Sequence, residues 1–415
     1  MPMKIGQVVR EYGIPVNSLY FYIHNGLLVP PRKNHQYLFD ERTIADLQWI
    51  LELKELEFPL KTIHRLLSLR RISNLCTEAD IQELKAIYRA QAETLREKEK
   101  KLAKARQILQ DKLASLEART ASPGRTGVPL QMLPLLCCPH CGGELLLDHV
   151  SMSQKYVWQA DLSCSCGYGA AIRDGILETG NVNTSPYDKP DTTRELYRDL
   201  PSRTLSLFER SYHWMEERIK KSGGTGHVWL ETYVTAWFFL HNHLELLAPD
   251  DCLIVVDKFP ETLRAYKKVI EEQGVPCPVL YIADASMQPP IRHHCIDRSM
   301  DFFGTNEHSF YHEDFYLDRM APYFSRDCRL FGVYFFFRTG AAPKSMQRYL
   351  SMYPGASAHN FHWEWFRDHL QGQFRLRDSE DCGDSLDSGD NLGLGFHAAG
   401  EELHLGAYSA VMKGM

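Results

Sequence analysis

Two pairs of cysteines near the middle of the 415-residue chain carry the clearest chemical pattern. Cys138-Pro-His-Cys141 and Cys164-Ser-Cys166 are separated by 22 residues, and a glycine follows each pair. Four thiolates within tetrahedral reach suit Zn²⁺, with Zn–S distances of about 2.3 Å, and a closed set of four sulfurs is structural. The second pair has the less usual spacing, so Cys137 or His140 could replace one ligand. The sequence therefore predicts a structural zinc ribbon over residues 137–180.

Acidic residues stand at the ends of apolar runs in the C-terminal part. Glu231 follows VWL, Asp257 follows CLIVV and Asp284 follows VLYIA. From about residue 225 such runs alternate with helix-like stretches, which predicts a parallel sheet covered on both faces. A carboxylate at such a junction can accept hydrogen bonds from ligand hydroxyls or amines. The simpler interpretation is that it only caps the next helix.

The stretch after Glu231 has an unusual composition. Tyr233, Thr235 and Trp237 fall at alternate positions, where a loop that cradles a nucleotide would carry glycine. With nearby Trp229, these aromatic residues could line a pocket for a planar apolar ligand. The alternative is that they only fill the core.

The elements that precede these groups are mainly helical. Residues 4–13 and 14–26 have the spacing of a helix-turn-helix, and PPRKNHQYLF after them suits a wing. Two amphipathic helices, interrupted at Phe58-Pro59, complete this head. Residues 78–119 contain no Gly or Pro and predict one long helix.

The long helix has an apolar position at every seventh residue. These positions are Ile81, Tyr88, Leu95, Leu102, Leu109 and Leu116. Such a stripe predicts a coiled-coil partner, although it could pack on the body of the same chain. The companion seam is only half apolar, which argues against a regular parallel zipper. It consists of Leu84, Gln91, Lys98, Ala105 and Lys112.

Charge is distributed unevenly along the chain. Residues 1–120 carry 20 Lys and Arg against 15 Asp and Glu, whereas residues 121–415 carry 27 against 38. A basic head and an acidic body suit a nucleic-acid-binding head on a body that does not touch nucleic acid. The N-terminus lacks the form of a secretory signal, and no apolar run reaches the length of a membrane span. We therefore expect a cytoplasmic protein without a membrane partner, whose 11 cysteines stay reduced.

The N-terminal pattern, with NGLLVPPR and TIADLQWILELKELEFPLKTIHRLL, resembles the MerR family of transcription regulators over about 70 residues. The resemblance implies a winged-helix head that binds double-stranded promoter DNA, and a homodimer joined by an antiparallel coiled coil. The candidate DNA contacts are Asn17, Ser18, Tyr20, Arg32, Lys33, Tyr37 and Lys61. The family usually has Arg where this chain has Tyr20 and Tyr37. Losing these cations should lower the affinity for DNA and its salt dependence.

The C-terminal order of strands and helices, with QFRLRDSEDCG and ELHLGAYSAVM as a final β pair, resembles class I S-adenosylmethionine-dependent methyltransferases. The resemblance implies that Asp257 holds the ribose hydroxyls and that Asp284 reads the adenine. The family's first loop is acid-x-Gly-x-Gly-x-Gly. This chain keeps the acid as Glu231 but replaces the glycines, so we expect that it does not bind S-adenosylmethionine.

The predicted fold is multidomain. It comprises an all-α winged helix-turn-helix (1–75), a dimerisation coiled-coil helix (76–120), a linker (121–136), the zinc ribbon (137–180) and an α/β Rossmann-like methyltransferase-type domain (181–415). We expect a MerR-type regulator whose last domain is not an enzyme and either senses a small-molecule effector or shapes the dimer. Its altered ligand site would contain Glu231, Tyr233, Trp237, Asp257 and Asp284. The alternative is an active methyltransferase directed to nucleic acid or a small molecule.

Overall fold

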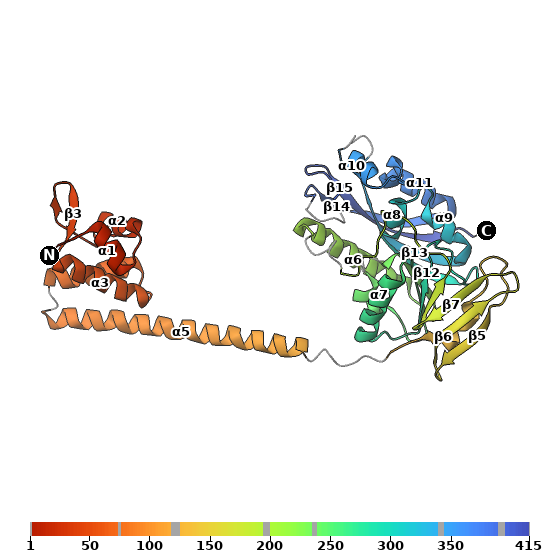
Figure 1. Ribbon diagram of the computed structural model, residues 1–415, viewed down its shortest axis with the longest axis horizontal. Helices are drawn as coiled ribbons and strands as arrows, with labels where there is room; N and C mark the ends of the chain where they lie inside the picture. The colour runs from red at the N-terminus through yellow and green to blue at the C-terminus, as the bar shows by residue number, and fades with distance from the viewer. Residues whose placement is uncertain are drawn as a thin grey trace. The chain divides into compact units, whose positions relative to one another are not determined.

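The computed structural model describes residues 2–73, 76–117, 125–193, 200–234, 239–338, 344–388 and 395–414. Trp237 of the expected ligand site lies outside these residues. The chain divides into two compact units, residues 1–121 and 122–415, which are described separately (Figure 1). None of the helices in the described part combines the length and apolar content that a membrane crossing requires.

The N-terminal unit begins with a small helical head that carries a wing. Its elements are β1 (Met3–Lys4), α1 (Ile5–Tyr12), α2 (Val16–His24), β2 (Arg32–Lys33), β3 (Gln36–Phe39), α3 (Glu41–Glu55) and α4 (Leu60–Ser68). The three strands form a sheet in the order β1-β3-β2. The tip of the wing is the two-residue loop Asn34-His35, with φ of 48° and 61°. Positive φ at both central residues gives the turn whose twist matches a tight hairpin.

Local signals explain where the helices of the head begin and how they pack. Asp40 accepts a 2.8 Å hydrogen bond from the N–H of Thr43 and so caps α3. Leu19, Ile50 and Ile63, from three different helices, are completely buried in one core. These helices and the wing confirm the predicted winged helix-turn-helix.

The long helix α5 (Glu78–Glu117) contacts the head along its first half, as far as Lys98, which pairs with Glu57. The ring of Tyr88 meets that of Phe58 edge-to-face at 5.5 Å. Further along, Leu102, Leu109 and Leu116 are 70, 65 and 59% exposed. The seven-residue stripe is thus covered near the head and uncovered beyond it, within the described residues.

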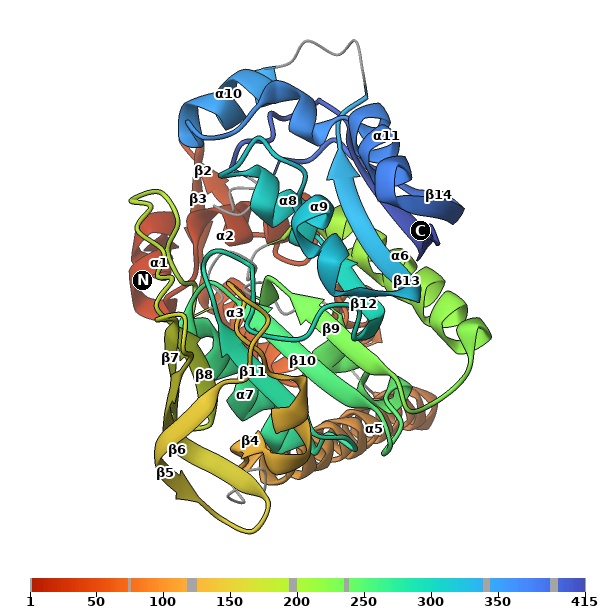
Figure 2. The same cartoon turned by 90° about the vertical axis from the view of Figure 1, so that its right-hand side faces the viewer.

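The C-terminal unit is built on one 12-stranded sheet (Figures 1 and 2). The strands of its main part are β9 (Val228–Thr232), β10 (Cys252–Asp257), β11 (Val279–Ala283), β12 (Ile296–Phe302), β13 (Phe324–Phe336), β14 (Phe374–Ser385) and β15 (Leu403–Met412). They lie in the order β11-β10-β9-β12-β13-β15-β14, and only the last two run antiparallel to their neighbours. This order is the doubly wound arrangement, closed by the β pair that methyltransferases add. The predicted fold class is confirmed.

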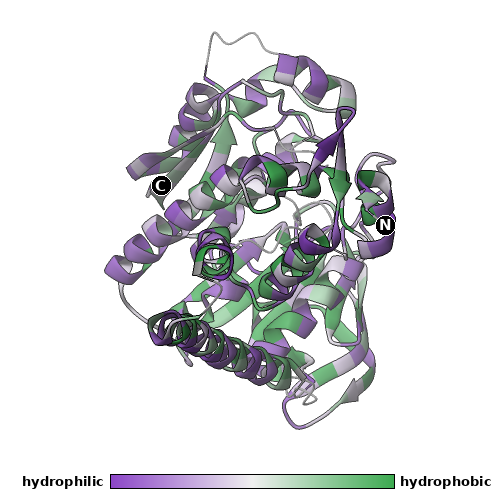
Figure 3. Cartoon of the chain, turned by 90° about the vertical axis from the view of Figure 1, so that its left-hand side faces the viewer, coloured by the Kyte–Doolittle hydropathy of each residue, from purple (hydrophilic) through white to green (hydrophobic). Residues whose placement is uncertain are grey.

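Helices cover both faces of this sheet. On one face lie α6 (Ser202–Ser222), α7 (Pro260–Gln273) and α10 (Lys344–Met352), and on the other lie α9 (Tyr316–Met320) and α11 (Trp363–Gln373). Along β9, Trp229 packs on the face covered by α6, α7 and α10, and Leu230 packs on the face covered by α9 and α11. Neighbouring side chains of a strand point to opposite faces of the sheet. The strands between the helices are accordingly mostly hydrophobic (Figure 3).

The remaining strands belong to the cysteine-rich segment. They are β4 (Val128–Pro129), β5 (Leu146–Met152), β6 (Tyr156–Ser163), β7 (Gly169–Arg173) and β8 (Ile176–Thr179). β8 pairs in parallel with β11, with Ile176 opposite Tyr281. The segment therefore extends the main sheet beyond β11. Nothing in the sequence indicated this pairing.

Candidate functional site

Two glycine turns bring the four predicted cysteines together. The Sγ atoms of Cys138 and Cys166 are 3.4 Å apart and those of Cys141 and Cys164 are 3.5 Å apart. A tetrahedral Zn²⁺ site with bonds of about 2.3 Å has S–S edges of about 3.8 Å, so the cluster is close to the required size. Gly142 and Gly167 supply the turns with φ of 71° and 92°.

The other two candidate zinc ligands stand outside this cluster. The N–H of Cys137 donates to the carbonyl of Pro290, and burial raises the pKa of its thiol. The ring of His140 packs on Tyr168 at 5.1 Å. Within the cluster, the backbone N–H of Cys166 lowers the pKa of Cys164 to about 7, which favours a thiolate. The four sulfurs fit a zinc ribbon.

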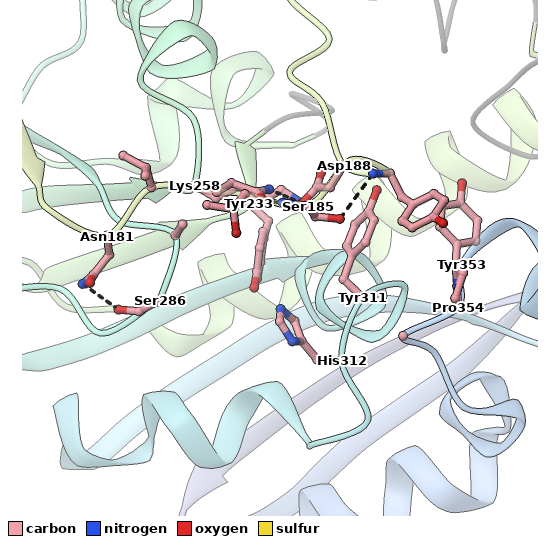
Figure 4. Close-up of a pocket in the computed structure, with 16 residues that line it drawn as sticks. Asn181, Ser185, Asp188, Tyr233, Lys258, Ser286, Tyr311, His312, Tyr353 and Pro354 are labelled. Carbon is pink, nitrogen blue, oxygen red and sulfur yellow. Dashed lines mark hydrogen bonds and ion pairs between the residues drawn. The ribbon is translucent and has the colours of Figure 1, made fainter.

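A cavity of about 450 Å³ lies at the edge where the parallel strands end (Figure 4). In an open α/β sheet this is the edge at which ligands bind. Asn181 and Ser286 stand at one end of the cavity, and Tyr311 and Tyr353 at the other. The full lining consists of Asn181, Val182, Asn183, Thr184, Ser185, Tyr187, Asp188, Tyr233, Lys258, Ala285, Ser286, Tyr311, His312, Tyr353, Pro354 and Gly355.

Tyr233 is the one described member of the predicted ligand site that lines this cavity. Its φ of 53° is left-handed, at the position where the methyltransferase pattern has its first glycine. Its hydroxyl lies 2.9 Å from Nδ1 of His308, whose Nε2 lies 3.3 Å from Asp314. Burial lowers the pKa of His308, so the ring is neutral near pH 7. With Nε2–H donating to Asp314, Nδ1 accepts a hydrogen bond from the hydroxyl of Tyr233.

Two residues of the cavity wall, Lys258 and Asp188, belong to a buried ion cluster. The ammonium of Lys258 lies 2.7 Å from Asp188 and 2.6 Å from Glu307. Burial alone would lower the pKa of Lys258, but the two carboxylates raise it by more than burial lowers it. The net shift of the pKa is upward, and the side chain stays charged. This cluster could not be predicted from the sequence, because its members come from three separate segments.

The three predicted carboxylates do not line the cavity. Oε2 of Glu231 accepts a hydrogen bond from Tyr266, and Oδ1 of Asp257 accepts one from the N–H of Phe259. Oδ1 of Asp284 accepts from both the N–H and the hydroxyl of Ser286. All three side chains are buried. All three lie behind the wall of the cavity, where Glu231 is held by α7 and the two aspartates bond to the residues just after them.

The lining of the cavity is more polar than the sequence suggested. Trp229, considered as part of an aromatic pocket, is buried in the core of one sheet face. Amides, hydroxyls and the ion cluster surround the cavity instead. They suit a polar ligand with both donors and acceptors.

Four of the candidate DNA contacts lie together on the head: Asn17, Tyr20, Arg32 and Tyr37. The guanidinium of Arg32 lies 4.5 Å from the ring centroid of Tyr37, which lies 6.3 Å from that of Tyr20. Asn17 and both tyrosines line the same shallow hollow. Lys33 and Lys61 are exposed and Ser18 is half-buried.

The sequence did not single out Arg71, which braces the helix-turn-helix. Its guanidinium donates to Asp46 at 2.8 Å and to the carbonyl oxygens of Gly26 and Leu27. It thus holds the end of α2 against α3. Arg71 lies 44 residues after Leu27 in the chain, so no local sequence pattern indicates their contact.

Comparison with known proteins bears on both units. Residues 3–69 match the family described as "MerR HTH family regulatory protein". No curated protein matches the chain. A methyltransferase of Aquifex aeolicus described as SAM-dependent is 16% identical, with a TM-score of 0.35, over 54% of this chain and 100% of its own. The geranyl diphosphate C-methyltransferase of Streptomyces coelicolor is 9% identical, with a TM-score of 0.35, over 48% and 76%. The MccD protein is 10% identical, with a TM-score of 0.37, over 48% and 96%.

The expectation that the chain is not an enzyme is wrong by this comparison, because the similar solved structures include methyltransferases. It rested on aromatic side chains filling the ligand volume. The structure instead places Tyr233 on the wall of a cavity. The cysteine cluster and the strand order agree with the predicted ribbon and sheet. Residues 3–69 are a MerR HTH family domain, joined in one chain to a sheet of the methyltransferase type.

Proposed function

We propose that the protein is a dimeric, cytoplasmic, DNA-binding transcription regulator whose C-terminal unit binds a small polar ligand. One observation carries this proposal. A MerR HTH domain stands on the same chain as a cavity of about 450 Å³ at the ligand-binding edge of an α/β sheet. In such a chain, the ligand in the cavity would bias the DNA affinity of the head.

The exposed part of α5 supports the dimer. Leu102, Leu109 and Leu116 form a stripe at seven-residue spacing that nothing in the described part of the chain covers. A second copy of the helix would bury this stripe, and the half-polar companion seam favours the antiparallel arrangement. We expect a dimer by light scattering coupled to size-exclusion chromatography. The double substitution Leu102→Glu and Leu109→Glu should give a monomer, whereas Lys101→Glu and Lys104→Glu should not.

The exposed face of the head supports DNA binding. Arg32 and Lys33 project from the wing, and Asn17 and Tyr20 stand on the second helix of the helix-turn-helix. Cations and hydroxyls of this kind fix a protein on phosphates, while the helix reaches base edges. The probe is labelled duplex DNA from the region upstream of the protein's own coding sequence.

The cavity supports ligand sensing, and S-adenosylmethionine is the first ligand to test. Its methionine end would have to share space with Tyr233 and with the buried Lys258 cluster. Calorimetric titration with S-adenosylmethionine and S-adenosylhomocysteine measures binding directly. Micromolar affinity, together with a changed affinity for the DNA probe, would support ligand sensing. No heat and no effect on DNA binding at millimolar concentration would rule out these two ligands.

The strand order also favours a second function, methyl transfer. The observation is the arrangement β11-β10-β9-β12-β13-β15-β14, with the cavity at the ends of the parallel strands. Bound S-adenosylmethionine would supply the methyl group, and the residues of this chain would orient the acceptor. Incubation with radiolabelled S-adenosylmethionine and DNA, RNA or a small-molecule extract tests it. Label on an acceptor supports this function, and binding without label limits the site to sensing.

A further inference from the structure

A second hollow of the C-terminal unit lies at the other ends of the strands. It has a volume of about 960 Å³ and is bounded by the end of α6, the starts of β12, β13 and β14, and the end of β15. The ligand cavity instead lies where β9, β10 and β11 end. The two hollows therefore occupy opposite edges of one sheet.

Cationic side chains gather in this second hollow. Six of them define what we call the basic cleft: Lys221, Arg298, Arg326, Arg329, Arg375 and Arg377. Its lining contains two carboxylates, those of Asp297 and Asp327. The oxygens of Asp297 already accept the N–H of Val228 and the hydroxyl of Ser325. The basic cleft is thus a locally positive surface in a part of the chain, residues 121–415, whose net charge is negative.

Strand register places three of these arginines in one row. Arg298 on β12 pairs with Arg329 on β13, which pairs with Val411 on β15, which pairs with Arg375 on β14. Residues paired directly across strands point to the same face of a sheet. Like charges placed opposite one another destabilise a sheet, so the row is unfavourable unless an anion compensates it.

The arginines differ in how they are used. Arg329 and Arg298 donate to the carbonyl oxygens of Ser222 and Gly223, and so fasten the end of α6. Arg298 is only 6% exposed, and its Nε–H has no hydrogen-bond partner in the described chain. Arg326, Arg375 and Arg377 are exposed, and no carboxylate of the described residues lies within ion-pair distance of them.

The shape and composition of the basic cleft indicate its ligand. Guanidinium groups match phosphate oxygens in pairs, and a row of them suits successive phosphates better than one small anion. Its two rings are those of Phe331, which is buried, and His227, which is half-buried and held at Nε2 by Arg298, so no fully exposed ring is available to stack on unpaired bases. These features favour the backbone of a duplex over a single strand.

We propose that the basic cleft binds the phosphate backbone of double-stranded DNA, independently of base sequence. The C-terminal unit would then provide a second DNA contact besides the winged head. This contact does not depend on whether the cavity at the other edge of the sheet binds a ligand. The proposal departs from the expectation, drawn from net charge, that the body does not touch nucleic acid.

The test uses the full chain with the contacts of the head removed. In a background of Arg32→Gln, Lys33→Gln and Lys61→Gln, binding of a labelled duplex of arbitrary sequence is followed by fluorescence anisotropy over a range of salt. Adding Arg375→Gln and Arg377→Gln should weaken binding about tenfold or more. It should also lower the slope of log K against log salt by about 2, because two phosphate contacts are lost.

The matched control carries Arg292→Gln and Arg367→Gln, which remove the same charge from an exposed and a half-buried position elsewhere on the unit. It should bind like the background, and unchanged melting temperatures would show that every variant is folded. Equal binding by the cleft variant and the control overturns the proposal. So does tighter binding of single-stranded RNA than of duplex, or competition by polyglutamate as strong as that by DNA of equal charge.

Discussion

The hydroxyl of Tyr266 on α7 donates a 2.5 Å hydrogen bond to Oε2 of Glu231 on β9. Both side chains are buried. Burial raises the pKa of Glu231 to about 7, although the bond from Tyr266 acts in the opposite direction. Glu231 is therefore a titratable group inside the core, at the acid position of the methyltransferase pattern.

This raised pKa predicts how stability depends on pH. The ordinary value is 4.5, so between pH 4.5 and about 7 the folded state binds more protons at Glu231 than the unfolded state does. The free energy of unfolding must then fall as pH rises through this range. Glu231→Gln should remove this dependence and stabilise the protein at pH 8 by up to about 3 kcal/mol. Thermal unfolding at pH 5, 6.5 and 8 measures it.

Glu364→Gln, at an exposed position of α11, is the matched control and should keep the pH dependence of the unsubstituted protein. If the melting curves of Glu231→Gln shifted with pH just as those of the control, Glu231 would already be ionised in the folded core.

Removal of one cysteine should abolish the metal site. Cys164→Ser is expected to lower the zinc content of the purified full-length protein by about one ion per chain, because a closed tetrahedral set needs all four ligands. It should also lower the melting temperature, since binding of a structural ion contributes to folding. Cys137→Ser, outside the cluster, should keep the zinc. Metal analysis decides the matter, and full zinc content in Cys164→Ser would refute the four-sulfur assignment.

The wing arginine should contribute a phosphate contact. We expect Arg32→Ala to weaken binding of the upstream duplex and to lower the slope of log K against log salt by about 1. Its loss also removes the cation that lies over Tyr37. Arg42→Ala, an exposed arginine on α3 outside the contact set, serves as control. Salt titrations of both variants that coincided with the parent protein would mean that the wing does not meet the DNA.

The buried ammonium of Lys258 should be essential to the wall of the ligand cavity. Lys258→Met leaves Asp188 and Glu307 facing each other without a cation, and we expect a loss of about 3–5 kcal/mol at pH 7. Lys268→Met, in an exposed pair with Glu272, should change stability by less than about 1 kcal/mol. Denaturant unfolding at pH 7 measures both losses, and equal losses in the two variants would contradict the prediction.

Features that depend on neighbouring residues could be predicted from the sequence. The cysteine pairs, the helix over 78–117 and the apolar strands follow from spacing and composition within short segments. Features that depend on distant segments could not. The pairing of β8 with β11 joins residues about 100 positions apart, and Lys258 meets partners from two other segments.

The acidic residues show the limit of reading a site from a pattern. The resemblance to methyltransferases implied ligand contacts for Asp257 and Asp284, each of which ends a strand. That position fixes where the backbone goes, but not whether the carboxylate faces a ligand or its own turn. In the structure each accepts hydrogen bonds from the residues just after it. Likewise, net charge could not reveal the basic cleft. Its arginines are far apart in an acidic part of the sequence, and only the strand pairing brings them together.

The pairing of β8 with β11 also joins two kinds of chemistry. β7 begins three residues after Cys166 and pairs with β8, and Asn181 of the cavity wall follows two residues after β8 ends. A single hairpin thus connects the cysteine cluster to the wall of the cavity. Any loosening of the cluster would therefore be transmitted to the cavity wall through paired strands rather than through a flexible loop.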